Sequence, residues 1–328
     1  MRTLSLALAL ALALPVAAQG ADRKPPPAKG GRQKIDFAPS YYILDVPGKY
    51  TPAQKYGIIF MFHGSGGRPE NYESNYAAAK NKGYILCLPA SRDPQGYDDE
   101  DMKRIVEIAK EVLAAYSIDR DRVYVSGHSA GGFVTCHLCT DHPEIFTAGA
   151  PVSGCLVSDE MARKMLKTPF RVVSGGKDFN HAQSKKSVED MKKAGMDVTF
   201  DEPPDWAHNP PAEAWKQQFE WMESLVPADC LGLLQGARAL VEAKQYGKAG
   251  AALKKLAGAK SAYAKNRAEL VAKAIDEAAT KAIADAKAAG DAKKTVDLLT
   301  KAKSQFAGSE AETKVVEALD AAKVALPK

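Results

Sequence analysis

Cysteine is scarce in this sequence. There are only five cysteines in 328 residues, and because the number is odd, at least one thiol has no partner within the chain. Cys136 and Cys139 have the spacing of a metal-binding pair, but no second pair and no suitably spaced histidine follows them. We therefore interpret both as packing residues and expect no metal site. Cys87 lies in an apolar run and is expected in the core.

The chain also lacks a strong charge and a long apolar run. The net charge is +5, with no concentrated basic face and no recognisable nucleic-acid-binding module, which argues against a dedicated nucleic-acid binder. The apolar run at residues 4–14 is shorter than the roughly 20 residues that a membrane span needs. Arg2 precedes this run, and Pro15 and small residues follow it. The pattern predicts a signal peptide over 1–18, cut after Ala18, and a secreted or periplasmic protein.

Composition divides the remainder of the chain into three parts. Residues 19–36 are rich in proline, glycine and basic residues and show no periodicity, so we expect a disordered linker. Residues 37–226 carry apolar runs and amphipathic segments and are expected to form the first folded domain. Residues 227–328 are rich in alanine and lysine and have no proline between Pro227 and Pro327. This last part is predicted to be almost wholly helical.

Within 37–226, segments with strand and helix patterns alternate. Apolar runs predict strands, and apolar residues at helical spacing predict amphipathic helices. Strands that lead into glycine-containing loops or turns are expected in the runs 56–67 and 122–132, and further strands at 41–47, 84–90, 146–154, 169–178 and 197–203. The expected helices lie at 101–118 and 182–196. Such alternation indicates an α/β fold with a mostly parallel sheet.

The alanine-rich part repeats itself weakly. A segment that begins at Ala243 resembles one that begins at Ala286, and the first contains two helical patterns joined by a short turn. It resembles a tetratricopeptide helical hairpin, so we expect an all-α, helical-hairpin C-terminal domain. An alternative is a helical appendage with no dedicated partner. If the protein binds a protein partner or an envelope surface, we expect this helical region to make the contact.

The sequence Gly127-His128-Ser129-Ala130-Gly131 matches the G-x-S-x-G pattern of a serine nucleophile. A predicted strand precedes it and a predicted helix follows, which is the context that this motif needs. In such a turn the serine hydroxyl stands clear of the sheet, and side chains at both glycines would collide with backbone. We therefore expect Ser129 to be a nucleophile.

A nucleophilic serine needs a base and an orienting acid, which follow it in the order serine, acid, histidine in this type of fold. Asp178 comes directly after a predicted strand, and His208 lies in a loop after the next one. We predict that Ser129, Asp178 and His208 form a catalytic triad. Asp205 and Asp201 are the alternative acids. His181 lies too close to Asp178 in sequence to be its partner and is an alternative rim residue.

Oxyanion donors are expected at two loops. The backbone N–H of Ala130 begins the helix after the nucleophile, and the loop "HGSGG" at 63–67 offers the N–H of Ser65, with Gly64 next. A plain glycine turn is the alternative for this loop. His63 and His128 precede the acid in sequence, so we expect them to have structural roles.

With these residues in place, the segment 37–226 resembles an α/β-hydrolase, and most closely the secreted poly(3-hydroxybutyrate) depolymerase and feruloyl esterase group. The pieces that carry the resemblance are "FMFHGSGG", "YSIDRDRVYVSGHSAGG", "APVSG", "SGGKD" and "WAHNPP". The resemblance implies a serine hydrolase that cleaves small-molecule or polymeric carboxylic esters without metal or cofactor. Residues 89–101 lack the tryptophan-rich segment often seen in that group, so the carboxylesterase and peptidase branches stay open.

Three functions fit these residues. The first is ester hydrolysis through an acyl-enzyme, and the second is peptide hydrolysis by the same residues. The third is an inactive hydrolase fold that binds partners through its helical region. The complete set of serine, acid, histidine and oxyanion donors favours an enzyme.

Overall fold

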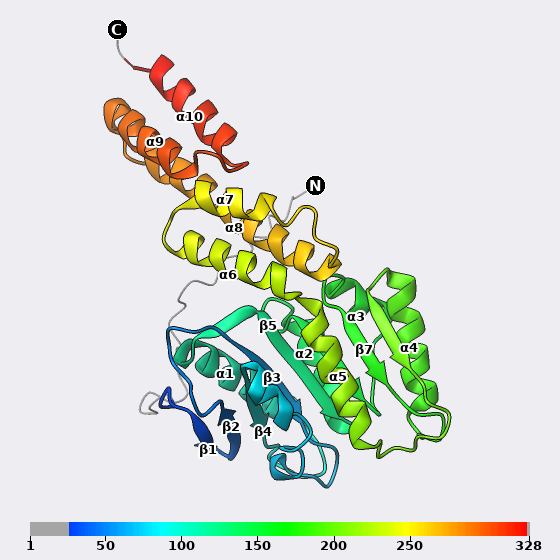
Figure 1. The fold of residues 1–328 in the computed structure, drawn as a ribbon. Helices are drawn as coiled ribbons and strands as arrows, with labels where there is room; N and C mark the ends of the chain where they lie inside the picture. Colours follow the sequence, from blue (N-terminus) through cyan, green and yellow to red (C-terminus); the bar gives the residue numbers. More distant parts are fainter. Residues whose placement is uncertain (1–25, 327–328) are drawn as a thin grey trace. The chain divides into compact units, whose positions relative to one another are not determined.

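The computed structural model describes residues 26–326, so the expected signal peptide and the first part of the expected linker lie outside the described residues (Figure 1). The chain divides into two compact units. One comprises residues 26–228 together with Ser261–Ala264, and the other comprises 229–260 and 265–326. No helix in the described part of the chain is long and apolar enough to cross a membrane.

The first unit contains an eight-stranded sheet in the order β1-β2-β4-β3-β5-β6-β7-β8. Its strands are β1 Gly31–Phe37, β2 Ser40–Val46, β3 Tyr56–Phe62, β4 Tyr84–Pro89, β5 Ile118–His128, β6 Ala148–Val152, β7 Phe170–Val173 and β8 Val198–Asp201. The pairs β1–β2 and β2–β4 are antiparallel. The six strands β4, β3, β5, β6, β7 and β8 are all parallel to one another. The expected α/β fold with a mostly parallel sheet is confirmed.

Helices cover both faces of this sheet. They are η1 Pro69–Asn71, η2 Ala77–Lys82, α1 Asp99–Ala115, α2 Ala130–Asp141, α3 Asp159–Lys164, α4 His181–Ala194 and α5 Ala212–Leu225. Ile58, Phe60 and Phe62 of β3 belong to the core cluster shared with α1 to α4. On the opposite face, Phe219 of α5 makes an edge-to-face contact with Tyr84. Because β3 is buried on both sides, it has the continuous apolar sequence expected of a central strand.

β1 corrects the expected domain boundary. Residues 31–36 fall within the expected disordered linker, but together with Phe37 they form an edge strand that pairs with β2 along its whole length. Arg32, Lys34 and Asp36 are exposed, while Ile35 and Phe37 pack against the core. Only every second side chain of a half-buried edge strand faces the core. The polar residues between them made this segment resemble a linker in the sequence.

The second unit is helical. Its helices are α6 Ala228–Glu242, α7 Tyr246–Lys254, α8 Ala262–Lys287, α9 Ala292–Phe306 and α10 Glu312–Val324. Tyr246 stacks on Phe306, with ring centroids 4.4 Å apart. Beside this pair, a Cβ at Gly247 would lie 1.9 Å from the carbonyl oxygen of Ala307, so glycine lets α7 approach the end of α9 closely.

The weak repeat is only partly equivalent in three dimensions. The segments that begin at Ala243 and Ala286 both lead through a turn into a helix, α7 and α9. Their later parts differ, since Tyr263 lies in the first turn of α8 whereas Phe306 is the last residue of α9. The helical character of this unit is therefore confirmed, while its likeness to tetratricopeptide repeats remains a prediction.

Candidate active site

Ser129 occupies the sharp turn between β5 and α2. Its backbone angles are φ 53° and ψ −114°, a conformation that a residue with a side chain adopts only when its surroundings hold it there. The Ser129 N–H donates to the carbonyl of Val152 on the adjacent strand at 2.9 Å, and its own carbonyl accepts from the N–H of Gly132. The turn is thus fixed by β6 on one side and by α2 on the other.

Four glycines around this turn permit close backbone contacts. A Cβ at Gly127 would lie 2.2 Å from the carbonyl oxygen of Gly131, and one at Gly131 would lie 2.3 Å from that of Phe62. Gly132 and Gly154 meet in the same way. A side chain at Gly127 or Gly131 would therefore collide with neighbouring backbone, as the sequence predicts.

The structure brings Ser129, His208 and Asp178 into one hydrogen-bonded chain. The Nε2 of His208 lies 2.9 Å from the Oγ of Ser129, and its Nδ1 lies 2.8 Å from the Oδ1 of Asp178. The His208 side chain is 20% exposed, whereas that of Asp178 is completely buried. The partly exposed imidazole thus contacts the Ser129 hydroxyl on one side and a buried carboxylate on the other.

Several donors stabilise the charged form of Asp178. Burial would raise the pKa of this carboxyl, but hydrogen bonds from the Asn180 N–H, from His208 and from the Ser174 hydroxyl outweigh it and lower the pKa. The Asn180 N–H lies 2.9 Å from Oδ1, and the Ser174 Oγ lies 2.9 Å from Oδ2. The carboxylate can thus remain ionised beside the imidazole.

The alternative residues from the sequence are engaged elsewhere. Asp201 forms an ion pair with Arg171 at 2.5 Å, and Asp205 pairs with Lys177 at the surface. His181 has its Nδ1 3.1 Å from the carbonyl of Ser174, and its ring stacks on Phe200 of β8. No contact between either alternative acid and His208 is present among the described residues.

The oxyanion candidates differ in whether their N–H groups are free. The Gly64 N–H donates to the hydroxyl of Tyr72 at 3.0 Å, so this donor is already occupied. Within residues 26–326, the backbone N–H groups of Ser65 and Ala130 have no acceptor. Gly64 nevertheless lies against Ser129, since a Cβ there would be 3.3 Å from the Cβ of Ser129. The loop at 63–67 thus reaches Ser129. Ser65 of this loop and Ala130 at the start of α2 remain as candidate donors.

Phe179 is a neighbour of the site that the sequence reasoning missed. Its ring stacks on the imidazole of His208, with centroids 3.9 Å apart and planes inclined by 27°. It is also 77% exposed, the largest exposed aromatic fraction among the described residues. A phenylalanine directly after the proposed acid was the only available signal, because the stacking depends on how two separate loops meet.

The cysteines are all buried. Cys136 and Cys155 have their sulfur atoms 3.6 Å apart, and none of the five forms a disulfide. In the described part of the chain, no group of three or more histidine, cysteine or acidic side chains is arranged to hold a metal ion.

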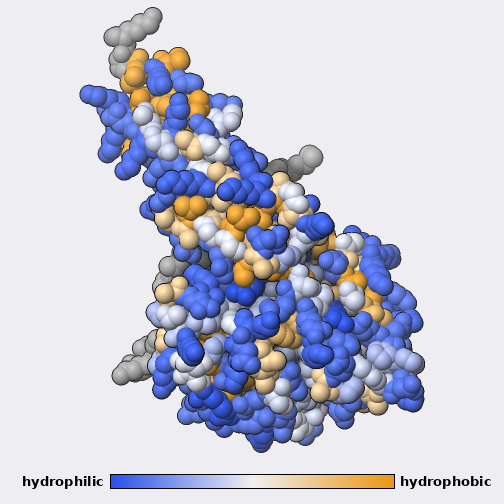
Figure 2. Space-filling model, in the orientation of Figure 1, coloured by the Kyte–Doolittle hydropathy of each residue, from blue (hydrophilic) through white to orange (hydrophobic). Residues whose placement is uncertain are grey.

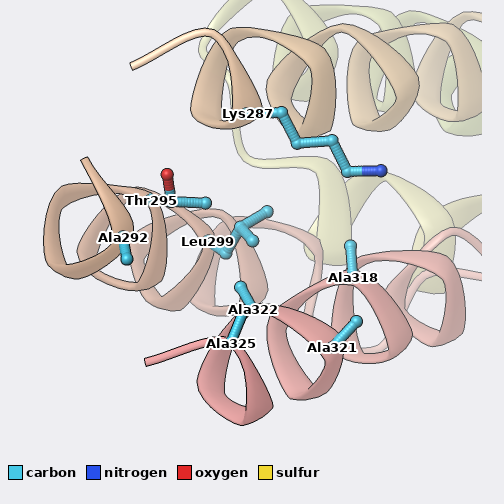
Figure 3. Close-up of a pocket in the computed structure, with 8 residues that line it drawn as sticks. All are labelled: Lys287, Ala292, Thr295, Leu299, Ala318, Ala321, Ala322 and Ala325. Carbon is cyan, nitrogen blue, oxygen red and sulfur yellow. The ribbon is translucent and has the colours of Figure 1, made fainter. Parts of the chain in front are cut away.

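The helical unit has a groove of its own, lined mainly by alanine (Figure 3). It has a volume of about 290 Å³ and is lined by Lys287, Ala292, Thr295, Leu299, Ala318, Ala321, Ala322 and Ala325. Figure 2 shows hydrophobic groups among hydrophilic ones over α9 and α10 near the C-terminus. Contact with a protein partner or an envelope surface through this unit stays a prediction.

Solved structures share the arrangement of the first unit. An S-formylglutathione hydrolase of Staphylococcus aureus has a TM-score of 0.50 at 15% identity, over 60% of this chain and 98% of that one. A fluorophosphonate-binding serine hydrolase of the same organism also has a TM-score of 0.50, at 14% identity over 59% of this chain and 98% of that one. The first unit has the α/β-hydrolase fold.

Sequence comparisons match parts of this α/β-hydrolase unit. The model of the prolyl oligopeptidase family matches residues 90–192, which include Ser129 and Asp178. Feruloyl esterase B of Talaromyces stipitatus is 30% identical over 156 residues, 42% of this chain and 40% of that protein. Feruloyl esterase B of Talaromyces funiculosus is 34% identical over 124 residues, 33% of this chain and 35% of that protein.

A shorter match, 40% identical over 50 residues, links the chain to a poly(3-hydroxyalkanoate) depolymerase of Paucimonas lemoignei, over 15% of this chain and 12% of that protein. The chain spans about two fifths or less of the length of these curated relatives.

Proposed function

We propose that this chain is a serine hydrolase that cleaves carboxylic esters, with Ser129 as nucleophile, His208 as base and Asp178 as the orienting acid. The most direct support is the continuous hydrogen bonding from the Ser129 hydroxyl through both nitrogens of His208 to Asp178. The esterase names of the curated relatives agree with this chemistry.

The geometry suits an acyl-enzyme mechanism. His208 Nε2 takes the proton from Ser129 as the oxygen attacks the ester carbonyl. Asp178 accepts a hydrogen bond from the Nδ1–H and stabilises the imidazolium. His208 then donates that proton to the leaving alcohol. Water attacks the acyl-enzyme along the same path, and the carboxylic acid leaves.

The developing oxyanion would be held by the backbone N–H groups of Ser65 and Ala130. Ala130 begins α2, so the positive end of that helix dipole also faces the negative charge. Loss of one such donor typically lowers turnover by about 10²–10³. The Gly64 N–H is not part of this set, because it is bonded to Tyr72.

Phe179 favours esters with an apolar or aromatic group near the scissile bond. One face of its ring covers His208, and the exposed remainder provides an apolar wall at the entrance of the site. The feruloyl esterases among the relatives are named for an aromatic acyl group. We propose small-molecule or polymeric esters of this kind as substrates.

Peptide hydrolysis is the second candidate function, and the match to the prolyl oligopeptidase family favours it. The same triad can attack an amide. Parallel assays with a p-nitrophenyl ester and a p-nitroanilide separate the two, because the ester hydrolase would turn over the anilide far more slowly.

The deciding experiment compares wild type with Ser129→Ala. Wild type should hydrolyse p-nitrophenyl acetate and react with a fluorophosphonate probe, and Ser129→Ala should do neither while its circular dichroism stays unchanged. Ser224→Ala, at an exposed position in α5, is the matched control and should keep full activity. A wild type that does not label would favour the inactive fold that acts as a binding module.

A further inference from the structure

Three loops that carry the proposed chemistry meet at one pair of side chains, Tyr72 and His128. The hydroxyl of Tyr72 lies 3.0 Å from the Gly64 N–H and 3.0 Å from the Nδ1 of His128. The Nε2 of His128 lies 2.7 Å from the backbone carbonyl oxygen of His208. Tyr72 and His128 therefore connect the oxyanion loop, the nucleophile turn and the loop that bears the base.

Every hydrogen bond in this connection has a fixed direction. The Gly64 N–H can only donate, so the Tyr72 oxygen accepts it, and the His208 carbonyl can only accept, so the Nε2 of His128 carries a proton. In a neutral imidazole the Nδ1 is then an acceptor, and it receives the Tyr72 hydroxyl proton. The four groups thus form one directed chain from Gly64 to His208 in which every N–H and O–H donor has an acceptor.

Neutral His128 is favoured by its surroundings. The residue is 6% exposed, and burial lowers its pKa, with His208 and Asp178 as the nearby titratable groups. Protonation would place a second N–H against the Tyr72 hydroxyl and would reverse that bond. The directed chain therefore exists only in the neutral state.

Packing leaves these groups little freedom. A Cβ at Gly64 would lie 2.8 Å from the Nδ1 of His128 and 3.1 Å from the Tyr72 hydroxyl. The ring of Trp215, from α5, meets both Tyr72 and His128 with centroids 6.4 Å away from each. A shift of either side chain would therefore move the backbone of Gly64 or of His208.

We propose that Tyr72 and His128 are positioning residues that hold the oxyanion loop and the base loop in register with Ser129. This role presupposes the ester hydrolysis proposed above. The bond from His128 fixes the backbone of His208, whose side chain must stay 2.9 Å from the Ser129 hydroxyl. The bond from Tyr72 fixes Gly64, directly before the candidate donor Ser65.

The kinetic test uses the full chain and three substitutions. Tyr72→Phe removes the link between Gly64 and His128, and His128→Leu removes the link to His208. Each should lower kcat for p-nitrophenyl acetate by about 10- to 100-fold with little change in KM, because misplaced catalytic groups slow the chemical step. His128→Gln, whose amide reaches the position of Nε2 and can donate to His208, should recover most of the loss.

Tyr76→Phe is the matched control. Like Tyr72, Tyr76 contacts Trp215 edge to face, and its substitution by phenylalanine removes a buried hydrogen bond, here to the Ser126 hydroxyl. Tyr76 lies outside the directed chain. It should keep kcat within about 2-fold of wild type, as expected for a change that leaves the reacting groups in place. Wild-type kcat in both Tyr72→Phe and His128→Leu would overturn the proposal, as would equal losses in Tyr76→Phe.

A second measurement does not depend on activity. Nitrogen-15 NMR of histidine-labelled protein should show His128 protonated at Nε2 and unprotonated at Nδ1, and Tyr72→Phe should shift the Nδ1 resonance. The opposite tautomer would refute the directed chain even in an inactive protein. A wild type that shows the expected tautomer but neither hydrolyses esters nor labels with fluorophosphonate would instead refute the ester hydrolysis.

Discussion

Two buried histidines beside the proposed site, His63 and His128, resist protonation. Burial lowers the pKa of both below the ordinary value of 6.5. His63 has its Nδ1 2.9 Å from the Gly64 carbonyl and its Nε2 3.2 Å from the Ser91 N–H, so a neutral ring satisfies both partners. The sequence predicted structural roles for both residues but not these bonds.

The pH dependence of stability follows from these shifts. As pH falls below about 6.5, the unfolded chain takes up protons at His63 and His128 that the folded chain refuses, so the free energy of unfolding falls. Urea denaturation at pH 8 and pH 5.5 should show this loss. His128→Gln should show a smaller loss than wild type, and an equal one would contradict the assignment to His128.

Removal of the aromatic ring next to His208 should weaken catalysis selectively. Phe179→Ala should lower kcat/KM for p-nitrophenyl acetate by about 2- to 10-fold, the worth of one aromatic contact, and should affect ethyl acetate less. Phe179→Leu should fall between. Leu166→Ala, an exposed apolar residue before β7, serves as control and should match wild type. Equal losses for both esters would argue against an apolar wall.

At the level of elements, the junction of β3, β5 and α2 depends on backbone contact. Gly131→Ala would place a methyl group 2.3 Å from the Phe62 carbonyl oxygen, and at least one of these elements would have to shift. We expect Gly131→Ala to lower the free energy of unfolding by about 1–3 kcal/mol, as for overpacked cores. The variant should also lose most of its activity.

Gly48→Ala provides the comparison within the same unit, because a Cβ there meets nothing within 4 Å. It should leave the urea midpoint unchanged or slightly raised. A Gly131→Ala protein as stable as Gly48→Ala would show that the close contact is not required.

Most of the sheet could be predicted from the sequence because its central strands are continuously apolar. β3 and β4 are buried along their whole length, and α1 has a clear amphipathic pattern. β1 could not be recognised, since its polar residues resemble the linker before it. Motif and order likewise singled out Ser129, but the contacts of Phe179 depend on loop conformations that no periodicity encodes.

At the scale of the whole molecule, the N-terminal prediction concerns residues outside the described part of the chain. If residues 1–18 are a signal peptide, the exported protein should begin at Gln19, and intact-mass measurement should show this loss. Leu8→Arg, which interrupts the apolar run, should keep the full-length chain inside the cell. An exported protein that retains Met1 would contradict the prediction.

The strained turn at Ser129 is imposed by glycines and neighbouring backbone, not by the serine side chain. The proposed nucleophile can therefore be removed while Phe179, the proposed base His208 and the loop at 63–67 keep their positions. Immobilised Ser129→Ala that is exposed to a mixture of natural esters should therefore bind the cognate ester without cleaving it. Mass spectrometry of the eluate would then identify that compound.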